Sequence, residues 1–307
     1  MAKIEIPAAL VANHRQINED EGGPAWLATV PTLAERYLEE WNLRHDGDPM
    51  HGFVSLVLPV VRADGVRAAL KLQPVTEEND TEAVGLTTWD GDGIVRLLDH
   101  DPATGTLLLE RLEGHRSLSQ VADDTEALTL LADLLARLVA HPAPPGIRHL
   151  RDISRQMVAD VPAAVEKVAS EQDRALLRNW GAIVAELTEE AGDRLLHWDM
   201  HYDNVLAADR EPWLAIDPKP LAGDPGFDLW PALDNRWEDV VATGDVPKAV
   251  LRRFDLLVDR LGLDSQRAAA WTYGRLLQNA LWDVQDGNPE FDGAQLAIGE
   301  ALRPRLT

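Results

Sequence analysis

The 307-residue chain contains no cysteine. Disulfide bonds, thiolate metal sites and thiol nucleophiles are therefore all excluded. Because chains without cysteine occur in reducing and in oxidising compartments, this absence does not fix where the protein works. Any catalysis or metal binding must depend on other side chains.

Basic residues are scarce relative to acidic ones. The chain has 29 lysines and arginines against 52 aspartates and glutamates, a formal net charge of −23. A negative field of this kind repels nucleic acid and anionic membranes and attracts cationic partners. The same surplus also keeps many proteins soluble without any role in binding. We therefore expect no nucleic-acid partner, and a cationic partner is one of two open explanations of the charge.

Long hydrophobic runs are also absent. No apolar stretch approaches the roughly 20 residues that a membrane-spanning helix requires, and Met1–Val11 lacks a basic region followed by an apolar core. These features predict no membrane partner, no signal peptide and a cytoplasmic location. Hydrophobic residues nevertheless make up 45% of the chain, enough to bury the core of one large domain or of two lobes that share a cleft.

Two kinds of secondary structure follow one another along the chain. Residues 1–40 are predicted to be mostly helical, and residues 113–307 carry helical periodicity. Between them, alternating apolar residues and turn signals predict about five strands, at 41–43, 56–61, 66–72, 94–98 and 106–110, and one helix at 81–89. Helices are expected near 124–141, 152–169, 172–191, 231–242, 247–262, 264–285 and 292–302. We predict an α+β fold with a strand-rich lobe at 1–112 and a larger helical lobe at 113–307, and with a ligand cleft between the lobes.

A short polar loop in the second lobe carries the most chemistry. Its pattern is His197-x-Asp199-x-x-x-x-Asn204, and a short apolar strand ending in Asp217 follows about a dozen residues later. An aspartate can act as a base, and asparagine and aspartate oxygens are ligands for a hard divalent cation. This spacing is typical of a kinase catalytic loop.

The first lobe offers a lysine and a glutamate that fit the same chemistry. Alternation in the strand at 66–72 places Ala69 and Lys71 on the face turned away from the core, where a small residue leaves room for a flat ring beside an ammonium group. Glu82 lies near the start of the next predicted helix. Each residue alone is most simply a surface residue. Together with the loop, they provide the cation and the support that phosphoryl transfer from a nucleotide requires.

Three segments carry a family resemblance, namely HWDMHYDNVL at 197–206, WLAIDPKP at 213–220 and GDPGFDL at 223–229. They resemble the aminoglycoside/hydroxyurea antibiotic resistance kinase family, of the streptomycin 6-phosphotransferase type, within the protein-kinase-like superfamily. Matching elements run from Trp41 to Trp282. The resemblance implies a bilobal protein-kinase-like fold and a phosphotransferase that uses ATP and Mg²⁺ to phosphorylate a hydroxyl of a small molecule.

The resemblance also implies roles in the loop. Asp199 would accept or orient the proton of the acceptor hydroxyl, and Asn204 and Asp217 would hold Mg²⁺ against the phosphates. His197 would brace the loop rather than carry a proton, and Asp228 would support the loop backbone from the next helix.

On the nucleotide side, Lys71 would contact the α- and β-phosphates and would pair with Glu82. Backbone groups of the segment from Glu110 to Leu112 would hydrogen-bond the adenine edge, so side-chain identity there carries little information.

Two features depart from protein kinases. There is no Gly-x-Gly-x-x-Gly motif, since the loop at 45–55 has only Gly47 and Gly52. Asp217 is followed by Pro218, which removes a backbone donor and stiffens the turn, and no activation segment follows. The stiff turn and the missing activation segment favour a constitutively active small-molecule kinase over a regulated protein kinase. The missing glycine motif bears less on function than on which residues contact the phosphates.

The acceptor is expected to contact acidic and aromatic residues late in the chain. Carboxylates and tryptophan faces bind guanidinium groups and amino sugars through ion pairs and cation–π contacts. Taken singly, the same residues are better explained as core tryptophans and solvated acids. As a set they favour a polar, cationic acceptor, and the candidates are Asp234, Glu238, Trp282, Asp283 and Asp286.

Three functions remain open at this stage. The first is a kinase of streptomycin-like aminoglycosides, and the second is a kinase of the same fold that acts on an amino sugar or a hydroxyurea-like metabolite. The third, a catalytically inactive nucleotide-binding protein, is disfavoured because Lys71, Asp199, Asn204 and Asp217 are all present. The sequence carries no signal for an oligomeric state.

Overall fold

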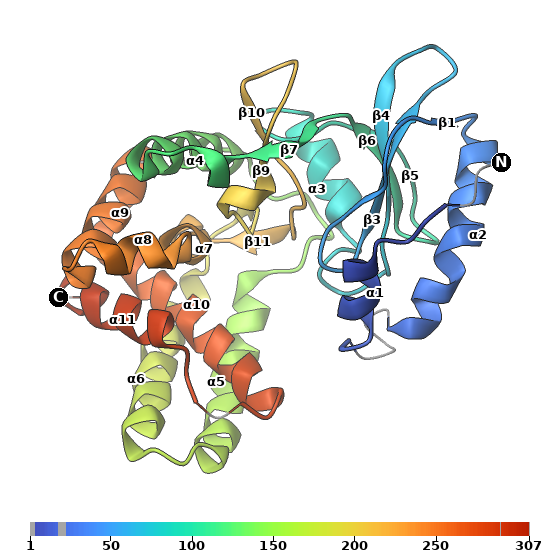
Figure 1. Ribbon diagram of the computed structural model, residues 1–307. Coiled ribbons are helices and arrows are strands. Elements are labelled where there is room, and N and C mark those ends of the chain that lie inside the picture. The colour runs from blue at the N-terminus through green and yellow to red at the C-terminus, as the bar shows by residue number, and fades with distance from the viewer. Residues whose placement is uncertain (1–3, 18–22, 289, 307) are drawn as a thin grey trace. The chain divides into compact units, whose positions relative to one another are not determined.

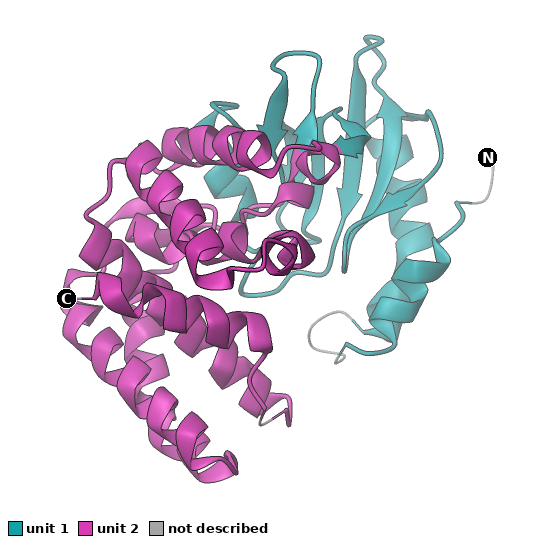
Figure 2. Cartoon of the chain, turned by 60° about the vertical axis from the view of Figure 1, so that its left-hand side comes forward, with its two compact units in different colours: residues 1–116, 206–216 teal, residues 117–205, 217–307 magenta. Residues whose placement is uncertain are grey.

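The computed structural model describes residues 4–17, 23–288 and 290–306 and divides into two compact units (Figures 1 and 2). Unit 1 comprises Met1–Arg116 and Leu206–Ile216, and unit 2 comprises Ser117–Val205 and Asp217–Thr307. The chain therefore returns from unit 2 to unit 1 for one short segment. The sequence prediction had counted this segment with the helical lobe.

Unit 1 contains a six-stranded sheet in the order β1-β3-β4-β6-β5, with β2 pairing to β3. Every pairing is antiparallel. Gly65, in the turn between β3 and β4, has φ +85°, a conformation that glycine adopts without strain. The strands are β1 Arg44–His45, β2 Met50–His51, β3 Leu56–Val61, β4 Arg67–Leu72, β5 Leu97–Asp101 and β6 Thr106–Glu110.

Helices α1 (Ala8–His14) and α2 (Pro24–Glu40) cover one face of this sheet (Figure 1). The buried residues Val30, Ala34 and Tyr37 recur at helical spacing along α2 and pack against apolar side chains of β3 and β4. Burying a side chain the size of Val30 contributes about 1.5–3 kcal/mol. Residues 18–22, between the two helices, lie outside the described residues.

Two strand predictions in unit 1 were wrong. Residues 41–43 form a turn in which Asn42 has φ +50°, so the first strand begins only at Arg44. Strand β5 begins at Leu97 instead of residue 94. Ile94 forms a single bridge with Ala215, a partner far away in sequence that local periodicity does not reveal.

Unit 2 is mainly helical. Aspartates begin several of its helices; Asp123, for example, accepts hydrogen bonds from the backbone of Thr125 and Glu126 at the start of α4. Helix α10 packs against α5 and α6. The helices are α4 Asp124–Leu138, α5 Leu150–Lys167, α6 Glu171–Leu187, α7 Trp230–Asp234, α8 Trp237–Ala242, α9 Val246–Leu261, α10 Ser265–Gln285 and α11 Gly293–Leu302, and in unit 1 α3 spans Glu82–Trp89.

The single helix predicted at 231–242 is instead two helices, α7 and α8. They are separated by Asn235 and Arg236, and Arg236 has φ +45°. The Arg236 guanidinium donates to the carbonyl of Val121 at 2.6 Å and to Asp124 at 3.2 Å. Val121 and Asp124, which are distant in sequence, thus stabilise the break between α7 and α8, and no local motif predicts these contacts.

Short strands complete the fold. Strand β8 (Arg194–Leu196) pairs antiparallel with β11 (Leu221–Gly223). A three-stranded sheet has the order β10-β9-β7, with β7 Glu113–Ser117, β9 Val205–Ala207 and β10 Trp213–Ala215. Among the described residues, no helix has both the length and the apolar character needed to cross a membrane.

Candidate active site

The predicted catalytic loop leaves β8 and is held by one buried carboxylate. Asp228, at the end of a short 3-10 helix, accepts hydrogen bonds from the backbone N–H of His197 at 2.9 Å and of Trp198 at 2.5 Å. Trp198 has φ +65°, a left-handed conformation that is unfavourable for a bulky residue. The two hydrogen bonds to Asp228 therefore stabilise a strained turn immediately before Asp199.

The environment of Asp228 opposes its ionisation. Its complete burial raises the pKa of Asp228 to about 7, and the charge of Asp199 adds to this shift. The two backbone N–H donors and Arg275 have the opposite effect and lower the pKa of Asp228. Asp228 thus titrates close to neutral pH.

Asp199 and Asn204 contact one another inside the loop. The Asn204 Nδ2 donates to the Asp199 carbonyl oxygen at 2.9 Å and lies 3.4 Å from its Oδ2. Asn204 is buried, whereas the Asp199 side chain is 36% exposed and can meet a substrate. Because the amide nitrogen of Asn204 is used within the loop, its Oδ1 is the atom suited to a cation.

Asp217 lies in a turn held against the same loop. The backbone N–H of Lys219 donates to the His197 carbonyl oxygen at 2.9 Å, and the Lys219 Nζ lies 3.4 Å from the Asp217 Oδ1. Asp217 has φ +57°, so this turn is also left-handed at one residue.

The oxygen donors of this loop fit Mg²⁺ rather than a softer metal. An amide oxygen and a carboxylate are hard ligands of the kind that Mg²⁺ prefers, with waters and phosphates completing its shell. Among the residues that the structure describes, no group of three or more histidines, cysteines, aspartates and glutamates could hold a metal ion. A metal bound by Asn204 and Asp217 would therefore need ligands from the nucleotide and from water.

A polar network that sequence reasoning missed braces the far end of the loop. The Tyr202 hydroxyl donates to Asp124 at 3.0 Å, and its backbone N–H donates to the Asn235 Oδ1 at 3.1 Å. Arg253 also donates to Asp124, at 2.9 Å. Burial is the main cause that raises the pKa of Tyr202, with the charge of Asp124 second, so Tyr202 stays a neutral donor. The position of Tyr202 within the motif was the only available signal.

In unit 1, Lys71 and Glu82 form a buried ion pair. The Lys71 Nζ lies 2.8 and 2.9 Å from the two Glu82 carboxylate oxygens, and the Gln73 Nε2 donates to one of them at 2.5 Å. The side chains of the pair are 5% and 1% exposed, which excludes the alternative of surface residues. The predicted alternation holds, since Ala68, Leu70 and Leu72 belong to the core cluster and Ala69 and Lys71 do not, although both of the latter are also buried. Gln73 carried no signal in the sequence.

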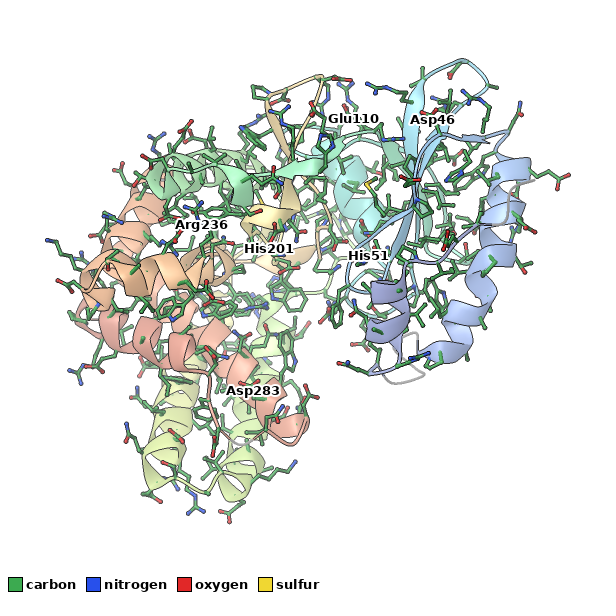
Figure 3. All side chains as sticks on the ribbon, in the orientation of Figure 1. Asp46, His51, Glu110, His201, Arg236 and Asp283 are labelled. Carbon is green, nitrogen blue, oxygen red and sulfur yellow. The ribbon has the colours of Figure 1, made fainter. Side chains whose placement is uncertain are left out.

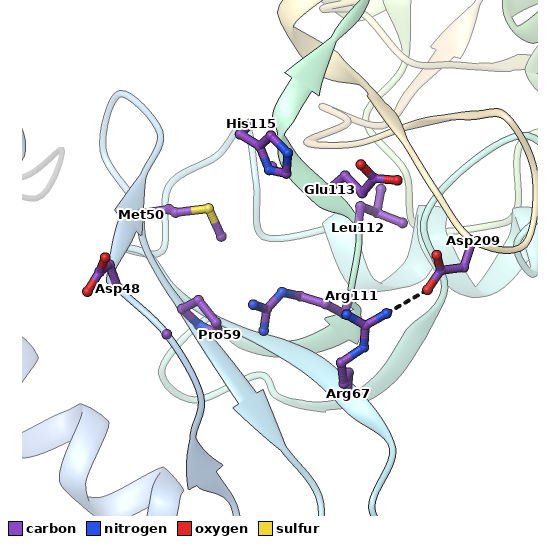
Figure 4. Close-up of a pocket in the computed structure, with 11 residues that line it drawn as sticks. Asp48, Met50, Pro59, Arg67, Arg111, Leu112, Glu113, His115 and Asp209 are labelled. Atoms are coloured by element: carbon purple, nitrogen blue, oxygen red, sulfur yellow. Dashed lines mark hydrogen bonds and ion pairs between the residues drawn. The ribbon is translucent and has the colours of Figure 1, made fainter.

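The segment from Glu110 to Leu112 connects β6 to β7. The Glu110 carboxylate binds Arg210, at 3.1 Å for each oxygen, and Leu112 is buried. Beside Leu112 lies a cavity of about 320 Å³ within unit 1 (Figure 4). Burial in this region lowers the pKa of Arg111. The cavity is lined by Gly47, Asp48, Met50, Pro59, Arg67, Arg111, Leu112, Glu113, Gly114, His115 and Asp209.

Two of the acidic candidates for acceptor binding, Asp234 and Asp283, interact with the charge of Asp292, a residue that sequence reasoning missed. Burial and then Asp292 raise the pKa of Asp234, at the end of α7, and Glu238 adds to the effect. Burial also raises the pKa of Asp283, on α10 (Figure 3), with Asp292 and Asp286 adding to it. A carboxylate whose pKa is raised by a neighbouring carboxylate is stabilised in its charged form by a bound cation.

Trp282 is already in contact with a cation of the protein. The Arg275 guanidinium lies 5.2 Å from the centre of the Trp282 ring, and the Trp198 ring lies 6.5 Å from it. Trp282 is 37% exposed. A substrate cation would therefore have to use the remaining exposed part of the ring.

Comparisons with known proteins agree with one another. Residues 40–287 match the profile of the aminoglycoside/hydroxyurea antibiotic resistance kinase family. The chain is 58% identical to a streptomycin 6-kinase of Streptomyces glaucescens over 98% of this chain and 97% of that one. It is 49% identical to a hydroxyurea phosphotransferase of Kitasatospora aureofaciens, over 99% and 87% of the two chains. An aminoglycoside phosphotransferase solved with AMP-PNP and hygromycin B shares the fold, with a TM-score of 0.59, 16% identity and coverage of 89% and 98%.

Proposed function

The chain belongs to the aminoglycoside/hydroxyurea antibiotic resistance kinase family, and on that basis we propose that it phosphorylates a hydroxyl of a streptomycin-like aminoglycoside. The observation that carries the proposal is the braced loop of unit 2, in which Asp228 fixes the turn before Asp199 and Asn204 contacts Asp199 directly. The hydroxyl at position 6 of streptomycin is the proposed acceptor, because the relative with 58% identity is named for that position.

The proposed reaction is a displacement at the γ-phosphorus of ATP. The acceptor oxygen forms the new bond to phosphorus while the bond to the oxygen that bridges the β- and γ-phosphorus breaks, and ADP leaves. The partly exposed Asp199 carboxylate orients the acceptor hydroxyl and takes its proton, which then passes to solvent. The hydrogen bonds from His197 and Trp198 to Asp228 support this role because they limit the movement of Asp199.

On the donor side, Lys71 contacts the α- and β-phosphates in this proposal. Its two short contacts with the buried Glu82 fix the direction of the ammonium group before any nucleotide binds. The backbone of the segment from Glu110 to Leu112 hydrogen-bonds the adenine edge, and the cavity beside Leu112 supports that placement.

Asn204 and Asp217 hold Mg²⁺ in this proposal. When bound, the ion neutralises charge on the phosphates. Asn204 presents its Oδ1 because its amide nitrogen is bound to Asp199, and Asp217 presents a partly exposed carboxylate. Lys219, beside Asp217, offsets part of the negative charge of this pair of ligands.

The acidic cluster around Asp292 supports a cationic acceptor. Streptomycin carries guanidinium groups, which pair well with carboxylates. Asp234 and Asp283 have raised pKa values, partly because of repulsion from Asp292. A bound guanidinium would relieve that repulsion.

Hydroxyurea is the second candidate acceptor, because the chain is 49% identical to a hydroxyurea phosphotransferase. Hydroxyurea is small and neutral, so it gains little from an acidic cluster. Binding of streptomycin should therefore depend on the Asp283 carboxylate and binding of hydroxyurea should not, so the variant Asp283→Asn distinguishes the two acceptors.

The test is an acceptor panel with purified protein and Mg²⁺-ATP. Streptomycin, hydroxyurea and a simple amino sugar are each incubated with the protein, and the phosphorylated product is identified by mass spectrometry and NMR. We expect a streptomycin monophosphate substituted at the 6-hydroxyl. We also expect Asp283→Asn to raise the KM for streptomycin and to leave any turnover of hydroxyurea unchanged. Turnover of hydroxyurea alone would refute the aminoglycoside assignment.

A further inference from the structure

Arg210 lies in the segment of unit 1 that returns from the helical unit, and its guanidinium makes five hydrogen bonds. Each of its five N–H groups has one acceptor. The Nε and one Nη2 hydrogen bind the two oxygens of Glu110, and the remaining three donate to the Gly91 carbonyl, the Ile94 carbonyl and the Glu211 carboxylate.

These acceptors belong to parts of unit 1 that are far apart in sequence. Gly91 and Ile94 lie in the connection between α3 and β5, at 2.8 and 3.0 Å from the guanidinium. The backbone of the same connection also pairs with Ala215, through N–H groups of Val95 and Ala215. Arg210, in the β9–β10 turn, and Ala215, the last residue of β10, thus both bind the same connection.

Glu110 is the last residue of β6, and its side chain is fully used. Both of its oxygens accept from Arg210, and Oε2 also accepts the backbone N–H of Arg96 at 3.2 Å. The Glu110 backbone N–H donates to the Arg96 carbonyl at 2.9 Å. The chain direction at Glu110 is therefore set by side-chain and backbone bonds together, one residue before Arg111 and Leu112.

We propose that Arg210 is a positioning residue for nucleotide binding, which sets the backbone of the segment from Glu110 to Leu112 so that it can receive the adenine edge. The inference rests on the proposed function, in which that backbone contacts adenine. The side chains of the Arg210–Glu110 pair are 22% and 19% exposed. A single ion pair near solvent adds little stability, whereas five directional hydrogen bonds constrain geometry strongly.

The same guanidinium positions the segment that leads into Asp217. Leu206–Ile216 joins the two predicted Mg²⁺ ligands, Asn204 and Asp217. An arginine that holds the middle of this segment limits the conformations open to Asp217. In this proposal Arg210 therefore affects nucleotide binding indirectly, through the backbone beside Leu112 and through the segment that leads to Asp217.

The test compares Arg210→Met and Arg210→Lys with a matched control. Arg155→Met removes another arginine that holds a glutamate with several hydrogen bonds, to Glu189, on an exposed surface of unit 2. For each protein, calorimetry gives the Kd for Mg²⁺-ATP, steady-state kinetics give the KM for each substrate, and a thermal melt gives the Tm.

We expect both Arg210 variants to raise the Kd and KM for Mg²⁺-ATP by about tenfold, while the KM for streptomycin changes by less than about twofold. Lysine keeps the charge but has no planar fork, so Arg210→Lys should not rescue nucleotide binding. Arg155→Met should bind nucleotide like the wild type.

Three results would overturn the proposal. Wild-type affinity for Mg²⁺-ATP in Arg210→Lys would show that the fork geometry is not needed, and this variant decides the question if Arg210→Met does not fold. Equal increases in both KM values, or a lowered Tm with unchanged nucleotide affinity, would show a merely structural role. Calorimetry needs no turnover, so wild-type protein that binds Mg²⁺-ATP but phosphorylates no acceptor would refute the proposed function and leave this test intact.

Discussion

Replacing Lys71 by methionine removes one half of the buried ion pair of unit 1 and keeps most of the length of the side chain. Glu82 is then left with the Gln73 amide, in a site where its side chain is 1% exposed. Removing one partner of a buried pair typically costs about 3–5 kcal/mol, because the other charge stays in a poorly solvated place. For a protein of this size we expect Tm to fall by roughly 5–8 °C.

A second substitution separates charge from packing. Adding Glu82→Gln to Lys71→Met removes the remaining charge and leaves two amides, those of residues 73 and 82, that can hydrogen-bond. We therefore expect the double variant to be more stable than Lys71→Met alone by about 1–3 kcal/mol, the usual cost of an unsatisfied buried group. Nucleotide affinity should be lost in both variants.

The assay is differential scanning calorimetry at neutral pH, with Lys248→Met as the control for removing a lysine from an exposed position of α9. The control should melt within about 1–2 °C of the wild type. A Lys71→Met protein that melts with the control, or a double variant no more stable than Lys71→Met, would show that the pair contributes no coupling and would refute the reasoning.

Three further predictions concern the loop of unit 2. Asp199→Asn should lower kcat by about a thousandfold and leave the Kd for Mg²⁺-ATP near the wild-type value; unchanged kcat in a steady-state assay would remove Asp199 from its role. Asp217→Ala should weaken nucleotide binding in Mg²⁺ and little in its absence, as measured by calorimetry with and without EDTA; equal affinities across a Mg²⁺ titration in variant and wild type would contradict it. Asp228 has a folded-state pKa raised from 3.8 to about 7, so between these values the folded state keeps a proton that the unfolded state has lost. Stability should therefore fall as pH rises from about 4 to about 7 and then level off, and Asp228→Asn should flatten that part of the Tm–pH curve; parallel curves for the two proteins would count against the shift.

The family, the kinase-like fold and the enzyme class could all be predicted from the sequence. Local signals were sufficient for most helices, because periodicity and capping act over a few residues; Asp264 at the start of α10 is an example. The candidate residues of the loop could also be found locally, since His197, Asp199 and Asn204 lie within one short motif. Their roles remain predictions, which the variants above test.

What could not be predicted depends on partners distant in sequence. The break between α7 and α8 is held by Arg236 contacts to Val121 and Asp124, and β5 begins late because Ile94 bridges to Ala215. From the sequence alone, Arg210 would be predicted to be an ordinary exposed arginine. Its proposed role depends on acceptors at residues 91–110. Pairwise distances of this kind are set by the whole fold and leave no trace in local composition.

The return of Leu206–Ile216 to unit 1 determines how this protein can be divided. A fragment that ends at Arg116 would contain Glu110 and Ile94 without the arginine and the strand that bind them. A fragment that starts at Ser117 would display the β9–β10 turn with no sheet to receive it. The chain should therefore not be divided between Arg116 and Ser117, although this is a boundary between the two units. Split reporters, chimaeras and shuffled libraries of this family would have to exchange the first 116 residues and the returning segment together.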